Sequence, residues 1–136
     1  MGMGIEKIGS AVDIAVSGLR AESLRMDVIS ANIANSNTVA AGNGMPYRRK
    51  EVVFSTLLDE VAGVSVEGVR DDPTAFKTVY EPGHPNADPS GYVRMPNVDV
   101  PVEMMHLVTA SRAYQANAAV LKRFQDSIDV TLELLR

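Results

Sequence analysis

The stretch with the most residues able to do chemistry is "EPGHPNADPSG", from position 81 to 91. It brings Glu81, His84 and Asp88 together at short spacing. Imidazole and carboxylate groups bind zinc, and a zinc site needs about three or four such ligands. The candidate ligands along the chain are Glu81, His84, Asp88, Asp99, Glu103 and His106. The first question is therefore whether this stretch is a metal or catalytic site or a stiff connector.

The spacing of these residues argues against catalysis. No His-x-x-His or His-Glu-x-x-His pattern occurs, and a histidine between Gly83 and Pro85 is more often a solvent-facing loop residue. No Gly-x-Ser-x-Gly elbow or phosphate-binding glycine loop is present, and the absence of cysteine removes thiolate sites. We expect no catalytic, metal-binding or cofactor-binding residues and no small-molecule substrate. A metal-dependent hydrolase centred on His84 remains a remote alternative.

Composition narrows the class of partner. A net charge of -4, with acids and bases interspersed, argues against nucleic-acid binding, since the one basic run, Arg48-Arg49-Lys50, is followed at once by Glu51. No apolar run approaches the roughly 20 residues that span a bilayer. The first 20 residues have neither a basic leader nor a continuous apolar core, so we expect no Sec-type signal peptide. The protein is then either cytosolic or exported by a route that reads no such signal.

The two ends of the chain are predicted to be long helices. Apolar residues recur every seven positions from Ile5 to Ile33 and from Val100 to Leu135, and a second row runs three or four positions later. A seven-residue repeat favours left-handed supercoiling against a partner helix. Glu22 interrupts the second row and must reach its edge or find a partner. The predicted helix–helix interface comprises Ile5, Ile8, Val12, Leu19, Met26, Ile29, Ile33, Leu107, Tyr114, Leu121, Ile128, Leu132 and Leu135.

Helix length predicts an elongated molecule. A helix of about 30 residues is roughly 45 Å long, whereas a compact globule of this size has a radius of gyration of only about 14 Å. The helices must form an elongated pair or pack on other molecules. Interior glycines such as Gly18 cost about 1 kcal/mol each, so we expect the ends to be poorly ordered in the free chain. Met104 and Met105 widen the apolar face, which favours a multi-helix assembly.

The middle of the chain differs in character. The first helix should stop near Asn35, because asparagine tolerates the conformation that ends helices. Strands are indicated around residues 64–66, 76–80 and 92–94, and Asp99 could cap the second helix. The predicted fold is mainly α: residues 1–39 and 97–136 form one discontinuous coiled-coil domain, and residues 40–96 form a small β-containing insert with extended loops.

Two blocks of sequence resemble the flagellar rod and hook family of axial proteins, most closely its proximal-rod members. The first is "SGLRAESLRMDVISANIANSNTVAAGNGMPYRRKEVVF" and the second is "VYEPGHPNADPSGYVRMPNVDVPVEMMHLVTASRAYQANAAVL". The motif residues are Ala31, Asn32, Ala34, Asn35, Pro96, Asn97, Val98, Asp99, Tyr114 and Asn117. By matching position, the resemblance implies packing and capping roles for Asn32, Asn35, Tyr114 and Asn117.

The resemblance implies a non-enzymatic structural subunit of the basal-body rod, a drive shaft that crosses the periplasm and transmits torque. It further implies export without a Sec signal, through the flagellar type III apparatus, and terminal helices paired in a coiled-coil layer around the export channel. The implied partners are proximal and distal rod proteins, the inner-membrane ring, export-gate components and copies of the chain itself. A coiled-coil adaptor unrelated to flagella is the alternative that shares the helical pattern.

Overall fold

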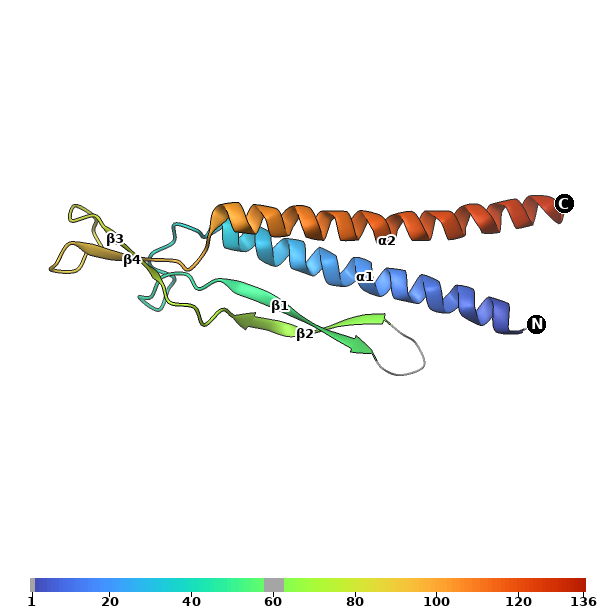
Figure 1. The fold of residues 1–136 in the computed structure, drawn as a ribbon, viewed down its shortest axis with the longest axis horizontal. Coiled ribbons are helices and arrows are strands. Elements are labelled where there is room, and N and C mark those ends of the chain that lie inside the picture. Colours follow the sequence, from blue (N-terminus) through green and yellow to red (C-terminus); the bar gives the residue numbers. More distant parts are fainter. Residues whose placement is uncertain (1, 58–62) are drawn as a thin grey trace.

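The computed structural model describes the backbone of residues 2–57 and 63–136 and the side chains of residues 11–55 and 63–136. The elements are α1 (Gly2–Ala34), β1 (Lys50–Leu57), β2 (Gly63–Asp71), β3 (Lys77–Tyr80), β4 (Tyr92–Met95) and α2 (Val100–Leu134). Helices α1 and α2 lie side by side and run in opposite directions, and the β1–β2 hairpin lies along α1 (Figure 1). The prediction of two terminal helices around a small β insert is confirmed.

The helix ends are fixed by polar side chains. The α1 helix ends at Ala34, and the next residue, Asn35, donates from its side chain to the carbonyl of Ala31 at 2.8 Å. The α2 helix begins at Val100, where the side chain of Asp99 accepts a hydrogen bond from the backbone N–H of Val102. Both ends agree with the sequence prediction, although α2 starts three residues after position 97. No helix among the described residues is long and apolar enough to span a membrane.

Small residues form the centre of the seam between the helices. Ala15, Gly18 and Ala21 of α1 and Ala110 of α2 are buried. A Cβ added to Gly18 would stand only 2.6 Å from Nδ2 of Asn117, so α2 approaches α1 where α1 carries no side chain. Among the described large apolar residues of the predicted interface, Ile29 alone is buried, and the others are half-buried or exposed. The contact is therefore close but narrow.

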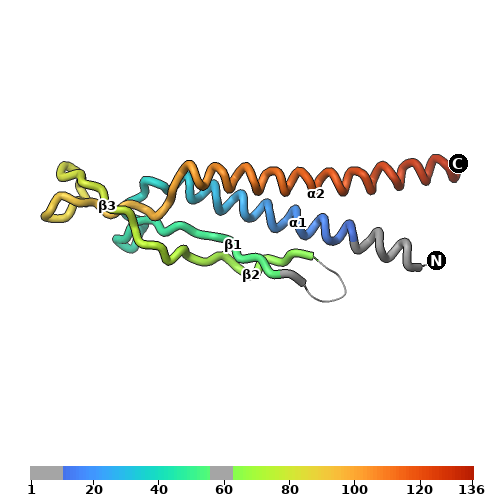
Figure 2. The backbone as a smooth tube through the Cα atoms, viewed as in Figure 1, coloured from blue at the N-terminus to red at the C-terminus, as the bar shows by residue number. Residues whose placement is uncertain are grey.

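The insert consists of two antiparallel hairpins that share no strand. The β1–β2 hairpin is fastened to α1 through Ser17, whose hydroxyl accepts from the backbone N–H of Val64 at 3.2 Å. The β3–β4 hairpin lies beyond the end of the helix pair at which α1 ends and α2 begins (Figure 2). Its last cross-strand pair, Tyr80 and Tyr92, packs edge to face with ring centroids 5.2 Å apart.

Three of the four strands among the described residues agree with the predicted segments, and β1 is the one that the sequence did not indicate. Its apolar residues, Val52, Val53 and Phe54, are consecutive and lack the alternation that marks a half-buried strand. In the structure the β1–β2 register shifts between Val53 and Phe54. Such an irregularity interrupts the alternation of side chains, so periodicity could not reveal the strand.

Candidate functional site: a buried polar joint

Asn32 fastens the last turn of α1 to the start of β1. Its side chain is fully buried: Nδ2 donates to the carbonyl of Lys50 at 2.8 Å, and Oδ1 accepts from the N–H of Lys50 at 3.0 Å. The hydroxyl of Tyr47 donates to the same Oδ1 at 2.9 Å. The amide of Asn32 thus pairs with the Lys50 backbone as a neighbouring strand would. An aspartate could not replace it, because a carboxylate cannot donate.

Glu103 joins the start of α2 to the same point. It is only 1% exposed, and it accepts a charge-assisted hydrogen bond from Nε of Arg49. Nδ2 of Asn32 lies 3.4 Å from its other oxygen. The sequence placed Glu103 among the candidate zinc ligands, and in the structure its carboxylate contacts Arg49 and Asn32. It is the buried partner of an arginine that precedes β1.

Arg49 is held by more than one acid. Its Nη1 lies 3.2 Å from Oδ2 of Asp72 and 3.5 Å from Oε2 of Glu51. Burial by itself would lower the pKa of the Arg49 guanidinium, but the hydrogen bonds and charges of Glu103 and Asp72 outweigh burial and raise it. Arg49 is therefore permanently charged, and it neutralises a carboxylate that water does not reach.

Asn97 completes the connection to the end of β2. Its Oδ1 accepts from the backbone N–H of Arg49 at 2.7 Å, and its Nδ2 donates to the carbonyls of Asp72 at 3.1 Å and Thr74 at 3.0 Å. Hydrogen bonds from the hydroxyl and backbone N–H of Thr74 are the main reason that the pKa of Asp72 is lowered. Arg48, the residue before Arg49, donates to the same two carbonyls, at 2.9 Å each.

We call the cluster of Asn32, Arg49, Asp72, Asn97 and Glu103 the joint. Its members come from α1, the segment before β1, the segment after β2, the segment before α2, and α2 itself. A buried polar group that loses its partner costs about 1–3 kcal/mol, and a buried charge costs more. Because these groups satisfy one another only in one arrangement, the joint fixes how the insert sits on the helix pair.

The structure places the motif residues in four settings. Asn32 and Asn97 belong to the joint, and Pro96 and Val98 are buried beside it. Asn35 and Asp99 lie at the helix ends, where their side chains hydrogen-bond to the backbone. Asn117 lies against Gly18, where its amide donates to the carbonyl of Ala113 at 3.1 Å. Ala31, Ala34 and Tyr114 are exposed.

The predicted interface residues are only partly covered. Ile29 is buried at 4% exposure. Val12, Leu19, Met26, Ile33, Leu107 and Leu121 are half-buried. Ile128, Leu132 and Leu135 are more than half exposed. The side chains of Ile5 and Ile8 lie outside the described residues. Glu22 is covered by the seam, with one oxygen 3.7 Å from Nη1 of Arg25 and no hydrogen bond to it.

The stretch from residue 81 to 91 is the loop between β3 and β4, so it lies before β4 and not immediately before α2. Nδ1 of His84 accepts from the backbone N–H of Asn86 at 3.0 Å, and Oδ1 of Asp88 accepts from that of Tyr92 at 2.8 Å. Gly91 has φ +87° and packs against the Tyr80 ring. Within the described part of the chain, no three His, Cys, Asp or Glu side chains are grouped to hold a metal. The polar residues of the loop shape its backbone.

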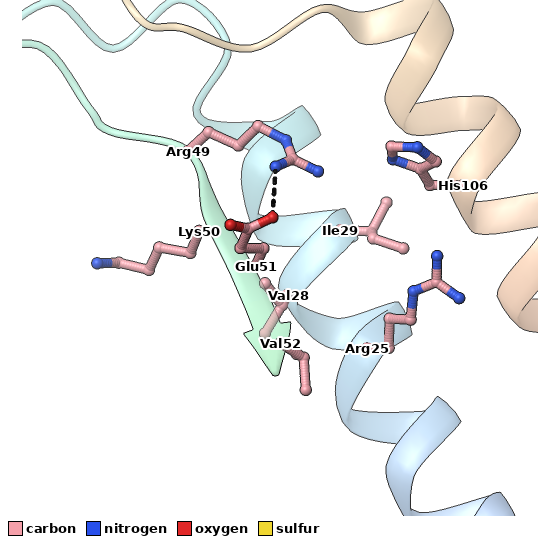
Figure 3. Close-up of a pocket in the computed structure, with 8 residues that line it drawn as sticks. All are labelled: Arg25, Val28, Ile29, Arg49, Lys50, Glu51, Val52 and His106. Carbon is pink, nitrogen blue, oxygen red and sulfur yellow. Dashed lines mark ion pairs between the residues drawn. The ribbon is translucent and has the colours of Figure 1, made fainter. Parts of the chain in front are cut away.

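The second feature near the joint is a cavity of about 250 Å³ between α1, β1 and α2. Figure 3 shows Arg25 and His106 facing one another across Ile29, with Arg49 closing one end and Lys50 pointing away. Guanidinium and imidazole groups that face one cavity are typical of an anion-binding site. However, Arg25 lies beside Glu22, and Arg49 is surrounded by Glu51, Glu103 and Asp72. These acids already neutralise the cations, so the cavity offers no net positive charge to a ligand.

Comparison with known proteins identifies the family. A family model described as "Flagella basal body rod protein" matches residues 13–41, and one described as "Flagellar basal body rod FlgEFG protein C-terminal" matches residues 90–134. A protein of Yersinia enterocolitica described as "Flagellar basal-body rod protein FlgC" is 46% identical over 125 residues, which covers 90% of this chain and 93% of the relative. The chain belongs to the FlgC family of flagellar basal-body rod proteins.

More distant FlgC relatives span the chain equally well. The match to FlgC of Agrobacterium fabrum has 40% identity over 136 residues and covers 97% of this chain and 98% of the relative. For FlgC of Bacillus subtilis the identity is 35% over 143 residues, with coverage of 91% and 95%. Membership of the FlgC family makes this chain a structural subunit of the flagellar rod. It also excludes the alternative of an adaptor unrelated to flagella.

Within the FlgC-family chain, the joint bridges the two matched segments. Asn32 lies in the first, and Asn97 and Glu103 lie in the second. Arg49 and Asp72 lie between them, in the insert. Sequence reasoning missed Arg49 and Glu103 as a pair. The available signal was a single acid in the apolar run "VPVEMMHLV", which is hard to place on a helix face unless a cation comes from elsewhere.

Proposed function

We propose that this FlgC-family subunit builds the proximal rod through a coiled-coil layer of its terminal helices, residues 1–39 and 97–136, and that it transmits torque through rigid packing. The supporting observation is an apolar stripe along α2 that is covered in its first part and exposed near its end. Ala110 and Leu121, on the face of α2 toward α1, are buried and half-buried. Ile128, Leu132 and Leu135 continue that face at helical spacing, yet they are 52%, 57% and 78% exposed.

A partner helix would gain from covering this stripe. Full burial of one aliphatic side chain is worth about 1.5–3 kcal/mol, so more than half of that remains available at each of the three positions. All residues from Gln125 to Arg136 are exposed. The end of α2 thus contributes little to the isolated fold and offers much to an assembly.

The α1 helix offers a second uncovered surface. A row of residues spaced seven positions apart lies at the margin of the seam and stays half-buried: Val12, Leu19, Met26 and Ile33. Leu19 and Tyr114 line an open groove of about 390 Å³ between the two helices. A third helix laid in this groove would complete the burial that one neighbour leaves unfinished. This is the physical basis for an assembly of more than two helices.

The joint gives the proposed drive shaft its stiffness. Helices aligned along the rod spread load over many apolar contacts, and residues 40–96 add lateral contacts outside that layer. If the insert could pivot on the helices, torque would be lost in the pivot. The buried pair of Arg49 and Glu103 opposes this motion. Moving the insert away from α2 would separate the two side chains and leave a buried carboxylate without its counter-ion, which is energetically costly.

The same proposal sets location and partners. The subunit leaves the cytoplasm through the type III apparatus and takes its place in the periplasmic part of the rod. There it contacts proximal and distal rod proteins, the inner-membrane ring, export-gate components and copies of itself. The incomplete burial of the helices supports export before final packing.

Deletion of residues 128–136 tests the coiled-coil layer. The truncated chain should keep the unfolding free energy of the isolated subunit within about 1 kcal/mol, because the removed residues are exposed. Rod assembly and swimming should be abolished. Working rods built from the truncated chain would refute the proposal, and co-purification of the full-length chain with basal bodies is the positive control.

A matched pair of point variants sharpens the test. Leu132→Lys and Val130→Lys alter residues of α2 that are 57% and 55% exposed, but Val130 lies on the opposite side of the helix from the stripe. Neither should unfold the subunit, and Leu132→Lys should impair swimming more. Equal effects would show that the stripe has no special role. His84→Ala should leave swimming unchanged, since it removes one hydrogen bond in a loop.

A further inference from the structure

The connection between α1 and β1 contains the chain's one Asn-Gly dipeptide, Asn43-Gly44. All residues from Ala41 to Met45 are exposed. Gly44 has φ +75°, and a Cβ built on it would meet no atom within 4 Å. The amide nitrogen of Gly44 therefore belongs to a residue that has no side chain and is exposed to solvent. No side chain on Gly44 therefore hinders the attack of its nitrogen on the side chain of Asn43.

A hydrogen bond activates that side chain. The backbone N–H of Met45 donates to Oδ1 of Asn43 at 3.0 Å. This donor draws electron density away from Cγ and makes it a better electrophile. It also stands where negative charge develops on Oδ1 if a nucleophile adds to Cγ, in the manner of an oxyanion hole. The loop therefore supplies a nucleophile and an electrophile with a stabilising donor.

We propose that Asn43 is a site of spontaneous deamidation and isoaspartate formation in the folded protein. The Gly44 nitrogen forms a bond to Cγ of Asn43, the bond from Cγ to Nδ2 breaks, and ammonia leaves with the proton that the Gly44 nitrogen loses. Water then opens the resulting succinimide at either carbonyl. One opening gives aspartate, and the other gives isoaspartate, with the main chain routed through the side chain. No oxidant or enzyme is required.

Other asparagines lack this combination. Asn32 and Asn97 are buried, with both ends of the amide hydrogen-bonded. The amides of Asn35 and Asn117 donate to helix carbonyls at 2.8 Å and 3.1 Å. For these four asparagines, and for Asn37 and Asn86, the following residue carries a side chain that crowds the attacking nitrogen. The reaction should therefore be selective for position 43.

The structural effect should stay within the loop. The N–H of Ala41 donates to the carbonyl of Met45 at 2.9 Å, and the N–H of Tyr47 donates to that of Thr38 at 2.8 Å. The second bond closes the loop before the joint begins. An added methylene and a new negative charge at position 43 should therefore leave the joint intact. Modification marks the age of a subunit without unfolding it.

The test is peptide mass spectrometry of the folded full-length chain after incubation at mildly alkaline pH. Cleavage after Arg25 and Arg48 releases one peptide that holds Asn32, Asn35, Asn37 and Asn43, so each serves as the others' control. Conversion of Asn43 should exceed that of Asn35 and Asn37 by roughly tenfold, with isoaspartate among the products. Equal conversion at these sites, or aspartate without isoaspartate, would overturn the proposal.

Two comparisons separate loop geometry from local sequence. Gly44→Ala should slow conversion by roughly tenfold, because a side chain hinders the attack and disfavours the positive φ. The second comparison uses urea-unfolded chain, in which the hydrogen bond from Met45 is lost. Conversion of Asn43 should be at least as fast in the folded chain as in the unfolded one. Slower conversion in the folded chain would mean that the loop protects Asn43, and the proposal would be wrong.

Discussion

Replacing Arg49 by methionine should destabilise the protein more than any surface change. Methionine retains much of the apolar stem of arginine while removing the charge. Glu103, at 1% exposure, would then be a buried carboxylate without a counter-ion, which costs about 3–5 kcal/mol. The lost contacts with Asp72 and Glu51 add little, because those acids reach solvent. A typical domain has only about 5–15 kcal/mol of stability, so this loss is large.

Urea unfolding followed by far-ultraviolet circular dichroism would measure the change in unfolding free energy. The matched control is Arg70→Met, which breaks a 2.8 Å pair with Glu51 at a side chain that is 65% exposed. That exposed pair should be worth at most about 1 kcal/mol. If Arg49→Met cost no more than Arg70→Met, the account of the joint as a buried ion pair would fail.

A second substitution separates lost charge from lost packing. Adding Glu103→Gln to the Arg49→Met chain removes the buried charge and keeps the shape, so the double variant should be more stable than Arg49→Met alone. Coupling between contacting residues of this kind amounts to about 0.5–3 kcal/mol. No recovery would mean that Arg49 acts by packing and not by charge.

Three further changes probe the seam, the acid response and the cap. Gly18→Leu should cost about 1–3 kcal/mol in thermal or urea unfolding, because the new side chain collides with Asn117 and forces the helices apart; a neutral result would mean that the seam is loose. Because the folded pKa of Asp72 is lowered, the stability it contributes is complete above the ordinary value of about 3.9 and is lost as the pH falls through the folded value. Asp72→Asn should therefore flatten the acid side of the stability profile, and an unchanged slope would contradict that assignment. Asp99→Ala should cost about 0.5–1 kcal/mol by removing the α2 cap, at the lower end because the bond to Val102 is 3.4 Å long; a loss above about 2 kcal/mol would show a further role for Asp99.

The sequence by itself determined what depends on neighbours along the chain. Seven-residue rows gave the two long helices, asparagine and aspartate gave their ends, and prolines and glycines gave the loop from residue 81 to 91. These features follow from short-range backbone chemistry, which each local stretch carries with it. The family resemblance rested on the same local blocks.

Only the tertiary structure decided which residues are buried together. Arg49 and Glu103 are 54 positions apart, and nothing near either of them in the chain names the other. The seam is centred on Ala15, Gly18 and Ala110, because two helices approach closely only where side chains are small or absent. A hydrophobic pattern, by contrast, is recognised by its large apolar residues. A heptad row states which face of a helix is apolar. How much of that face one neighbour covers is settled by packing in three dimensions, and here it leaves the end of α2 exposed.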